Sequence, residues 1–377
     1  MRVATGAAVI EPGTDRLTVP LDFAPTALVL WWGATEPDGV RAGNGGGLGF
    51  CAGRQAAVAW ASADAVAPTQ TARRAAESGV LGIDAAGGVI LRGEPALEAG
   101  GFAVDWSSTA RSPWTLHYVA VGGSDVEAAA GSLESPRVTG RAAVNGLGSE
   151  PDLVLLAPTG PESFDQAQRG LCAAVGAAAG RRQAGASYVS RDGAVEAEVG
   201  GAQRGGAAVV TAADLGGLAA LARLEGGALD WETVWPTPRR VPYLALRGMK
   251  ARVGTARGPT EPGSRKVRVG FRPEGVLLFT WGLSHRPGPA DIGRLCIGAA
   301  TPDAQGCLSW DDRDTQEPAT ATHVRSSTRE GLVVTNTQTG GIHAAASVSS
   351  FDRRGFTLDW TASDGHEREF VWVALGG

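Results

Sequence analysis

The chain ends with Phe356-Thr357-Leu358-Asp359-Trp360, followed by Trp372-Val373-Ala374-Leu375-Gly376-Gly377. Apolar and polar residues alternate in the first segment, which is typical of a strand with one buried face. The same pair of segments occurs twice earlier, as Phe102–Trp106 with Tyr118–Gly123 and as Leu229–Trp231 with Tyr243–Gly248. The Trp and the closing Gly are 17 residues apart each time (106 to 123, 231 to 248, 360 to 377). This constant spacing predicts three copies of one structural unit.

The beginnings of the copies also correspond. Each opens with an Arg-Val pair and continues, after a proline, into an apolar strand; the pairs are Arg2-Val3, Arg137-Val138 and Arg252-Val253. We therefore expect units at residues 1–123, 136–248 and 249–377, of which the second is the most divergent. The intervening segment 124–135, which contains a Glu-Ala-Ala-Ala-Gly-Ser run, is interpreted as a linker.

The composition favours an all-β fold. Gly accounts for 55 of 377 residues, and glycine disfavours helix interiors. Segments such as Leu28–Trp32 are apolar on both faces and should lie between layers. Only residues 212–224, with leucines three apart, suggest a helix. We expect three tandem β-sandwich, jelly-roll-like domains, and a pseudo-threefold arrangement of them is a natural possibility.

Charge and composition exclude several classes of protein. The net charge of −5 argues against a nucleic-acid-binding protein. No apolar run is long enough for a membrane span or a signal peptide, so we expect synthesis in the cytoplasm without membrane insertion. Cys51, Cys172 and Cys296 fall on the same expected strand of each copy and have apolar neighbours, which favours buried thiols over disulfides.

Catalytic and cofactor motifs are sparse. The five histidines form no zinc-ligand pattern, the Gly-rich segment 43–49 lacks the Lys-Ser/Thr of a phosphate loop, and we expect no cofactor or metal and no enzymatic activity. The acidic segment Asp311-Asp312-Arg313-Asp314 is the best candidate for a carboxylate site, although it does not match a calcium loop. The Asp before each repeated Trp (Asp105, Asp230, Asp359) is better explained by an outward hydrogen bond to a neighbouring loop than by catalysis.

The adjacent Trp31 and Trp32 must point to opposite faces of their strand. Packing within or between sheets is the favoured interpretation, and exposure of one ring for stacking on a sugar is the alternative. The candidate ligand or interface residues are therefore Trp31, Trp32, Asp311, Asp312 and Asp314.

The closing segments resemble a unit of structural proteins from tailed bacteriophages and prophages. In that unit a Phe-Thr-Leu-Asn-Trp-Thr-type strand precedes a Tyr-Leu-Ala-Leu-Gly-Gly-type strand, similar to 356–361 and 372–377 here. The opening Phe-x-Pro pattern that leads to Trp-Gly (Phe23, Pro25, Trp32; Phe271, Pro273, Trp281) is similar to the same group. Copy two lacks the Phe, with Gly227 in its place, and lacks the closing Gly-Gly. The resemblance implies a virion component and transfers no catalytic residues.

The resulting hypothesis is a non-enzymatic virion protein of the tail, baseplate or fibre region, assembled in the host cytoplasm. Its expected partners are other virion proteins, and a homo-oligomer is also considered. A capsid decoration protein is the first alternative. A lectin-like protein that binds host surface polysaccharide through exposed Trp and Asp is the second.

Overall fold

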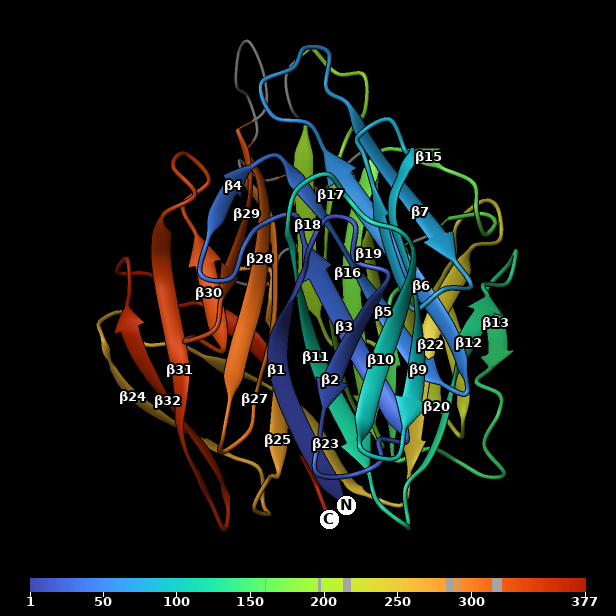
Figure 1. Ribbon diagram of the computed structural model, residues 1–377, viewed down its shortest axis with the longest axis vertical. Helices are drawn as coiled ribbons and strands as arrows, with labels where there is room; N and C mark the ends of the chain where they lie inside the picture. Colours follow the sequence, from blue (N-terminus) through green and yellow to red (C-terminus); the bar gives the residue numbers. More distant parts are fainter. Residues whose placement is uncertain (160, 196–197, 213–217, 283–287, 290–291, 314–320) are drawn as a thin grey trace.

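The computed structural model describes residues 1–159, 161–195, 198–212, 218–282, 288–289, 292–313 and 321–377. All regular secondary structure in these ranges is β-strand, and every sheet pairing is antiparallel. The predicted all-β class is therefore confirmed. The strands form three units, each made of a large and a small sheet (Figure 1).

The strands of the first unit are β1 (Arg2–Ile10), β2 (Arg16–Pro20), β3 (Ala27–Gly33), β4 (Val40–Ala42), β5 (Asn44–Ala52), β6 (Arg54–Ser62), β7 (Thr71–Ala76), β8 (Val80–Ile83), β9 (Val89–Glu98), β10 (Gly101–Ser108) and β11 (Trp114–Gly122). Those of the second are β12 (Glu127–Glu134), β13 (Gly140–Ala143), β14 (Leu153–Leu156), β15 (Gln168–Arg169), β16 (Leu171–Ala179), β17 (Arg182–Ser190), β18 (Val199–Arg204), β19 (Ala208–Thr211), β20 (Leu218–Glu225), β21 (Ala228–Thr233) and β22 (Arg240–Arg247). Those of the third are β23 (Lys250–Arg257), β24 (Gly263–Arg268), β25 (Gly275–Thr280), β26 (Gly288–Pro289), β27 (Ile292–Ala300), β28 (Gln305–Arg313), β29 (Thr322–Ser327), β30 (Leu332–Thr335), β31 (Ile342–Asp352), β32 (Gly355–Ala362) and β33 (Glu369–Gly376).

The three units share one strand order. The seven-stranded sheets run β1-β11-β3-β5-β6-β7-β15, β12-β22-β14-β16-β17-β18-β26 and β23-β33-β25-β27-β28-β29-β4. The four-stranded sheets run β2-β10-β9-β8, β13-β21-β20-β19 and β24-β32-β31-β30. Each small sheet packs on one face of its own large sheet, so each unit is a β-sandwich.

The seventh strand of every large sheet comes from another unit. Strand β4 of the first unit pairs with β29 of the third, β15 of the second pairs with β7 of the first, and β26 of the third pairs with β18 of the second. In each unit the donated strand comes directly before the strand that is fourth in the order of its own large sheet: β4 before β5, β15 before β16 and β26 before β27. The exchange passes from unit to unit and returns to its start, which is the connectivity of a cyclic trimer within one chain.

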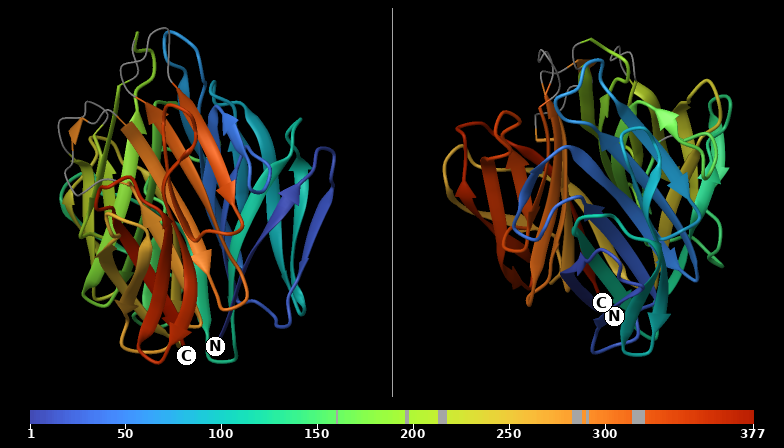
Figure 2. Two further views of the ribbon diagram at one scale, coloured as in Figure 1. Left: turned by 90° about the vertical axis from the view of Figure 1, so that its left-hand side faces the viewer. Right: turned by 45° about the horizontal axis from the view of Figure 1, so that its top comes forward.

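Two kinds of core follow from this arrangement. Each sandwich has its own buried cluster between its two sheets. A further cluster, here called the axial core, combines buried residues from all three units, among them Trp31, Trp60, Tyr188, Trp281 and Trp310. The views in Figure 2 show the three units side by side around this centre. Both faces of each large sheet are thus covered, which explains why all of β3 is buried.

The Gly-rich segment 43–49 belongs largely to strand β5, and its glycines make room for tryptophan rings. A Cβ at Gly46 would lie 2.2 Å from Nε1 of Trp310, and one at Gly47 would lie 2.4 Å from the ring of Trp32. A Cβ at Gly49 would lie 2.0 Å from the carbonyl oxygen of residue 79, directly before β8 of the small sheet. The glycines are therefore required by close packing on both faces of β5.

The interpretation of 124–135 as a linker is wrong for most of its length, because Glu127–Glu134 forms β12 and pairs along its whole length with β22. The small residues that suggest a linker fit beneath a large ring, since Gly131 lies against Tyr243. Gly6 in β1 lies against Tyr118 in the same way. The pair at residues 137–138 is consequently not the first strand of the second unit, and Val138 is exposed.

The expected helix at 212–224 is also wrong where the structure describes it. Leu218–Glu225 is strand β20, between β19 and β21, and residues 213–217 lie outside the described residues. The leucines of this segment therefore do not form a helical face. Leu221 and Leu224 are buried within the second unit.

The molecule has two distinct ends. Met1 and Gly377 lie together at one end, where a Cβ on Gly377 would be 3.5 Å from the Met1 nitrogen (Figure 1). Strand pairing places Gly122, Ala27 and Cys51 near the end that holds the termini. Gly33 and Asn44, at the other ends of β3 and β5, lie at the opposite end of the molecule, together with Ser62, which pairs with Asn44. The polar residues of the candidate site lie at this opposite end.

Candidate functional site

Asp311 and Asp312, adjacent on β28, are both fully buried and point to opposite faces of their sheet. Asp312 shares a face with Trp310, which belongs to the axial core. Asp311 faces the interior of the third sandwich. The structure therefore separates the two carboxylates into different environments, and Asp314 lies outside the described residues.

Asp312 belongs to a group of polar side chains that closes the axial core at the end opposite the termini. We call this group the axial polar layer; it comprises Asn44 and Ser62 of the first unit, Tyr188 and Ser190 of the second, and Asp312 and Thr322 of the third. Each of these residues is at most 3% exposed. Because the members come from three units, the layer exists only when the units are closed around the axis.

Strand registers place three members of the layer at corresponding positions. Ser62, Ser190 and Asp312 each follow, by two residues, an aromatic residue of the axial core: Trp60, Tyr188 and Trp310. Alternation along a strand puts residues two apart on the same face, so all three side chains point toward the axis. Thr322 pairs with Asp312, and Asn44 pairs with Ser62.

Asn44 connects the three units within the layer. Its Nδ2 donates hydrogen bonds to the hydroxyl of Tyr188 and, over 3.2 Å, to Oδ1 of Asp312. Several oxygens of the layer have no hydrogen-bond partner among the described residues; they are Asn44 Oδ1, Ser62 Oγ, Ser190 Oγ, Asp312 Oδ2 and Thr322 Oγ1. Unpaired buried oxygens are rare in folded proteins and costly, at about 1–3 kcal/mol each.

Burial raises the pKa of Asp312 to about 7, because a charged carboxylate loses its hydration there. The Asn44 hydrogen bond opposes this increase, and the charge of Asp311 adds to it. The hydroxyls of Ser62 and Ser190 approach the carboxylate closely enough to favour its charged form, although neither completes a hydrogen bond of normal geometry. Burial also raises the pKa of Tyr188 well above its ordinary value.

Asp311 has a different partner. Its Oδ1 lies 3.1 Å from Nδ1 of His323 on β29, and this hydrogen bond raises the pKa of His323. Arg294, the residue paired with Asp311 across β27, is 2% exposed, and burial lowers its pKa to about 10. The carboxylate of Asp311 is therefore held among cationic side chains, which identifies it as part of a buried charge cluster in the third sandwich.

The two tryptophans of β3 lie in two different cores. Trp31 is in the axial core, where its ring stacks on His117 with centroids 5.5 Å apart. Trp32 is in the first sandwich and donates a hydrogen bond to the carbonyl of Leu81 over 2.7 Å. Neither side chain is exposed, so neither can stack on a sugar, and the packing interpretation is confirmed.

The repeated aspartates pair with neighbouring strands instead of loops. Asp105 accepts a hydrogen bond from Arg16 of β2 over 2.5 Å, and Asp359 accepts one from Ser264 of β24 over 2.6 Å. Asp230 lies opposite Arg141 in the register of β13 and β21. These positions are on the outer faces of the small sheets, which supports a structural role.

The cysteines are free and buried, as predicted. Burial raises the pKa of Cys51 and of Cys172 to about 11, so neither thiol is activated. Although Cys51, Cys172 and Cys296 all lie on corresponding strands (β5, β16, β27), the registers place them at three different positions along those strands.

Two cavities open beside the axial polar layer, one at the end of each of the first two sandwiches. A cavity of about 750 Å³ in the first unit is lined by residues that include Asn44, Ser62 and Trp114. A cavity of about 690 Å³ in the second unit is lined by residues that include Ser190, Trp235, Arg73 and Arg239. Ligand-sized space is thus present at this end, with an apolar wall and a few polar groups.

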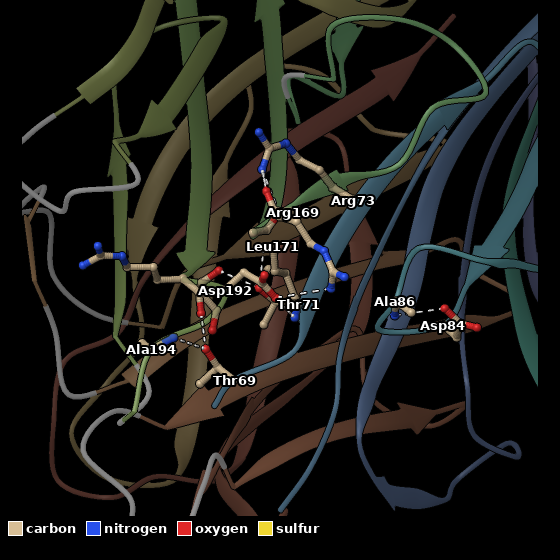
Figure 3. Close-up of polar contacts among 12 residues, drawn as sticks. Thr69, Thr71, Arg73, Asp84, Ala86, Arg169, Leu171, Asp192 and Ala194 are labelled. Carbon is tan, nitrogen blue, oxygen red and sulfur yellow. Dashed lines mark hydrogen bonds and ion pairs between the residues drawn. The ribbon is translucent and has the colours of Figure 1, made fainter. Parts of the chain in front are cut away.

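Polar contacts hold the donated strand β15 of the second unit against the first unit (Figure 3). Arg73 of β7 donates to the carbonyl oxygens of Arg169 and Gly170 over 2.9 and 2.7 Å. The amide of Thr71 donates to Asp192 over 2.7 Å, and the hydroxyl of Thr69 donates to the carbonyl of Arg191 over 2.7 Å. Hydrogen bonds of the first unit therefore reach both the exchanged strand and the turn that follows β17 of the second unit.

Within the described ranges, no group of three or more His, Cys, Asp or Glu side chains is arranged to hold a metal ion. The same part of the chain contains no helix long and apolar enough to cross a membrane. No protein-family model matches the chain, and no curated protein matches it.

Sequence reasoning identified Asp311 and Asp312 but missed Asn44, Ser62, Tyr188 and Ser190. These residues lie between 120 and 270 positions from the aspartates or from one another across units, and single Ser or Asn residues carry no motif. One usable signal was present, because Ser62, Ser190 and Asp312 lie at or one residue before the end of the strand that follows the cysteine-bearing strand in each copy.

Proposed function

We propose that this chain is a non-enzymatic structural component of a phage or phage-like virion, associated with the tail, baseplate or fibre. The observation that carries the proposal is the cyclic strand exchange, which makes one chain into a closed body with pseudo-threefold symmetry. Such a body presents three similar faces, and these match a threefold or sixfold position in a larger assembly.

The two ends of the molecule support an assembly role. Both termini lie at one end of the axis, which leaves the opposite end and the three outer sheets available for contacts with neighbours (Figure 1). The thiols are buried in the sandwich cores, and the buried Asp311 and Asp312 are inaccessible to a large substrate. These features favour a building block over an enzyme.

The proposal is tested on particles purified by density gradient from a lysate of the source strain. We expect peptides of this chain in the particle band and, by cryo-electron microscopy, density for the pseudo-trimer on a threefold or sixfold axis of the tail, baseplate or fibre. Density on the capsid surface would instead support a decoration protein. Absence of the chain from particles, with known virion proteins present in the same band, would overturn both roles.

A further inference from the structure

The axial polar layer contains more oxygen ligands than its own hydrogen bonds use. Asn44 Oδ1, Ser62 Oγ, Ser190 Oγ, Asp312 Oδ2 and Thr322 Oγ1 are all buried and all without a partner in the described structure. Their strands direct them to the axis, because each shares a sheet face with a residue of the axial core. The relevant core residues are Leu48, Trp60, Tyr188, Trp310 and Val324.

The orientation of Asn44 is fixed by its contacts. Its Nδ2 is occupied by Tyr188 and Asp312, which belong to two other units, so the amide lies between them and its oxygen is left as an acceptor. The layer thus brings together one carboxylate, one amide oxygen and hydroxyl oxygens. Hard cations such as Na⁺ and Ca²⁺ prefer this oxygen-only set of ligands.

The charge balance also favours a cation. Asp312 forms no ion pair with a basic side chain among the described residues, whereas the nearby His323 is paired with Asp311. A buried carboxylate is stable when it is paired, bound to a metal or protonated. Asp311 lies next to the layer but is paired with His323, so Asp312 is the carboxylate left to balance a positive ion.

We propose that the axial polar layer binds one hard cation on the pseudo-threefold axis, with Asp312 as its charged ligand and Asn44, Ser62 and Ser190 as neutral ligands. The ion connects the three units at the end opposite the termini. This site is not an acidic metal cluster of the usual kind, since two of the three corresponding positions carry Ser in place of Asp.

The first experiment measures the thermal midpoint of the purified full-length protein after removal of metal ions, at constant ionic strength set with choline chloride. NaCl and CaCl₂ are titrated in separate arms to identify the ion. We expect one of the two ions to raise the midpoint in a saturable manner, because a ligand that binds only the folded state stabilises it. No midpoint shift in either arm would overturn the proposal.

The second experiment uses Tb³⁺ as a luminescent replacement for the cation. Trp60 and Trp310 lie directly beneath the layer and Tyr188 belongs to it, so excitation of these rings should sensitise bound Tb³⁺. We expect saturation at one Tb³⁺ per chain and competition by the ion that raises the thermal midpoint. Absence of sensitised emission that this ion displaces would contradict a site at this position.

Variants identify the ligands. Asp312→Asn retains the shape of the side chain and should weaken cation binding at least tenfold and abolish the midpoint shift. Asp359→Asn, on an outer sheet, is the matched control and should bind as the wild type does. Ser62→Ala provides a second test if Asp312→Asn does not fold, with an expected severalfold loss of affinity. Wild-type binding by either layer variant would overturn the proposal.

Discussion

The two faces of the large sheets pack against different partners, one against the small sheet of the same unit and the other against the other two units. Corresponding positions follow from the registers, in which Leu30 pairs with Gly49, Leu156 with Gly176 and Leu278 with Gly298. On the sandwich face this set is uniform, whereas Trp32 of the first unit corresponds to Thr280 of the third. On the axial face an aromatic set, Trp60/Tyr188/Trp310, is retained, and other sets differ in volume or charge: Trp31/Ala157/Phe279, Phe50/Ala177/Ala299 and Ser62/Ser190/Asp312.

The cores on the two faces are filled by different numbers of units. Each sandwich core is filled by one unit alone, so a change of side-chain volume there must be balanced within the same unit. The axial core is filled by three units together, and only the total volume at each level must fit. Because the units are joined in one chain, their axial side chains need not be identical, and large residues of the first unit are matched by alanines of the second.

The largest effect should come from redistributing volume at the axis. Phe50→Ala should lower the free energy of unfolding by about 3–5 kcal/mol through loss of a buried ring. Ala177→Phe should lower it by about 1–3 kcal/mol through overpacking. We expect the double variant to lose less than the sum, because total volume is restored. Urea unfolding measures the free energy of unfolding of all three variants, and strict additivity would show that residues 50 and 177 do not share space in the axial core.

The next effect concerns pH and His117, which stacks on Trp31 and lies 3.0 Å from Ser326 of the third unit. Burial lowers the pKa of His117 to about 3 from 6.5. Between these values the unfolded chain binds a proton that the folded chain does not, so stability is lost as pH falls. From pH 6.5 to about 4 this loss amounts to roughly 3 kcal/mol.

The measurement for His117 is the free energy of unfolding as a function of pH for the wild type and His117→Gln. Carboxylates contribute equally to both curves, so their difference isolates the histidine. We expect the wild-type curve to be steeper below pH 6.5. Parallel curves would mean that His117 is accessible to protons at the boundary between the first and third units.

A smaller, local effect is expected at the exchanged strand β15. Arg73→Met removes the donors to the carbonyl oxygens of Arg169 and Gly170, at a cost of about 1–3 kcal/mol for the acceptors that lose their partner. Hydrogen exchange should accelerate at the β15–β7 junction and stay unchanged in β29, which pairs with β4. Equal acceleration at both junctions would indicate that the three exchanges open together.

The smallest effect concerns the cysteines, which are all buried in the sandwich cores, where burial raises the pKa of Cys51 and of Cys172 to about 11. A thiol reagent at pH 8 should label none of the four in the folded protein and all four in denaturant. Native labelling of one cysteine would reveal that its sandwich opens independently of the axial core.

Much of the fold could be predicted from the sequence, because the decisive signals are local. Alternation in Phe356–Trp360 marks a half-buried strand, and the apolar run at Leu28–Trp32 marks a strand covered on both faces. The divergent first strand of the second unit was missed because the small residues that accommodate Tyr243 look like a linker.

The candidate site was less predictable. Exchanged strands such as Val40–Ala42 are two or three residues long and carry no periodicity, so the three repeats suggest a pseudo-threefold arrangement but not the strand exchange that closes it. The axial polar layer depends on that closure, since Asn44, Tyr188 and Asp312 meet only when the three units surround one axis. The acidic segment alone does not show that Asp312 faces the axis and Asp311 the interior of the third sandwich.

The central claim is that the three units form one closed body, and cleavage between units tests it most directly. A protease site is inserted between Ser124 and Asp125, which are exposed, and the cleaved protein is analysed by size-exclusion chromatography with light scattering. We predict that the fragments stay together with the mass of the uncut chain, 38.5 kDa. Separation of residues 1–124 as an independent domain under native conditions would contradict the account.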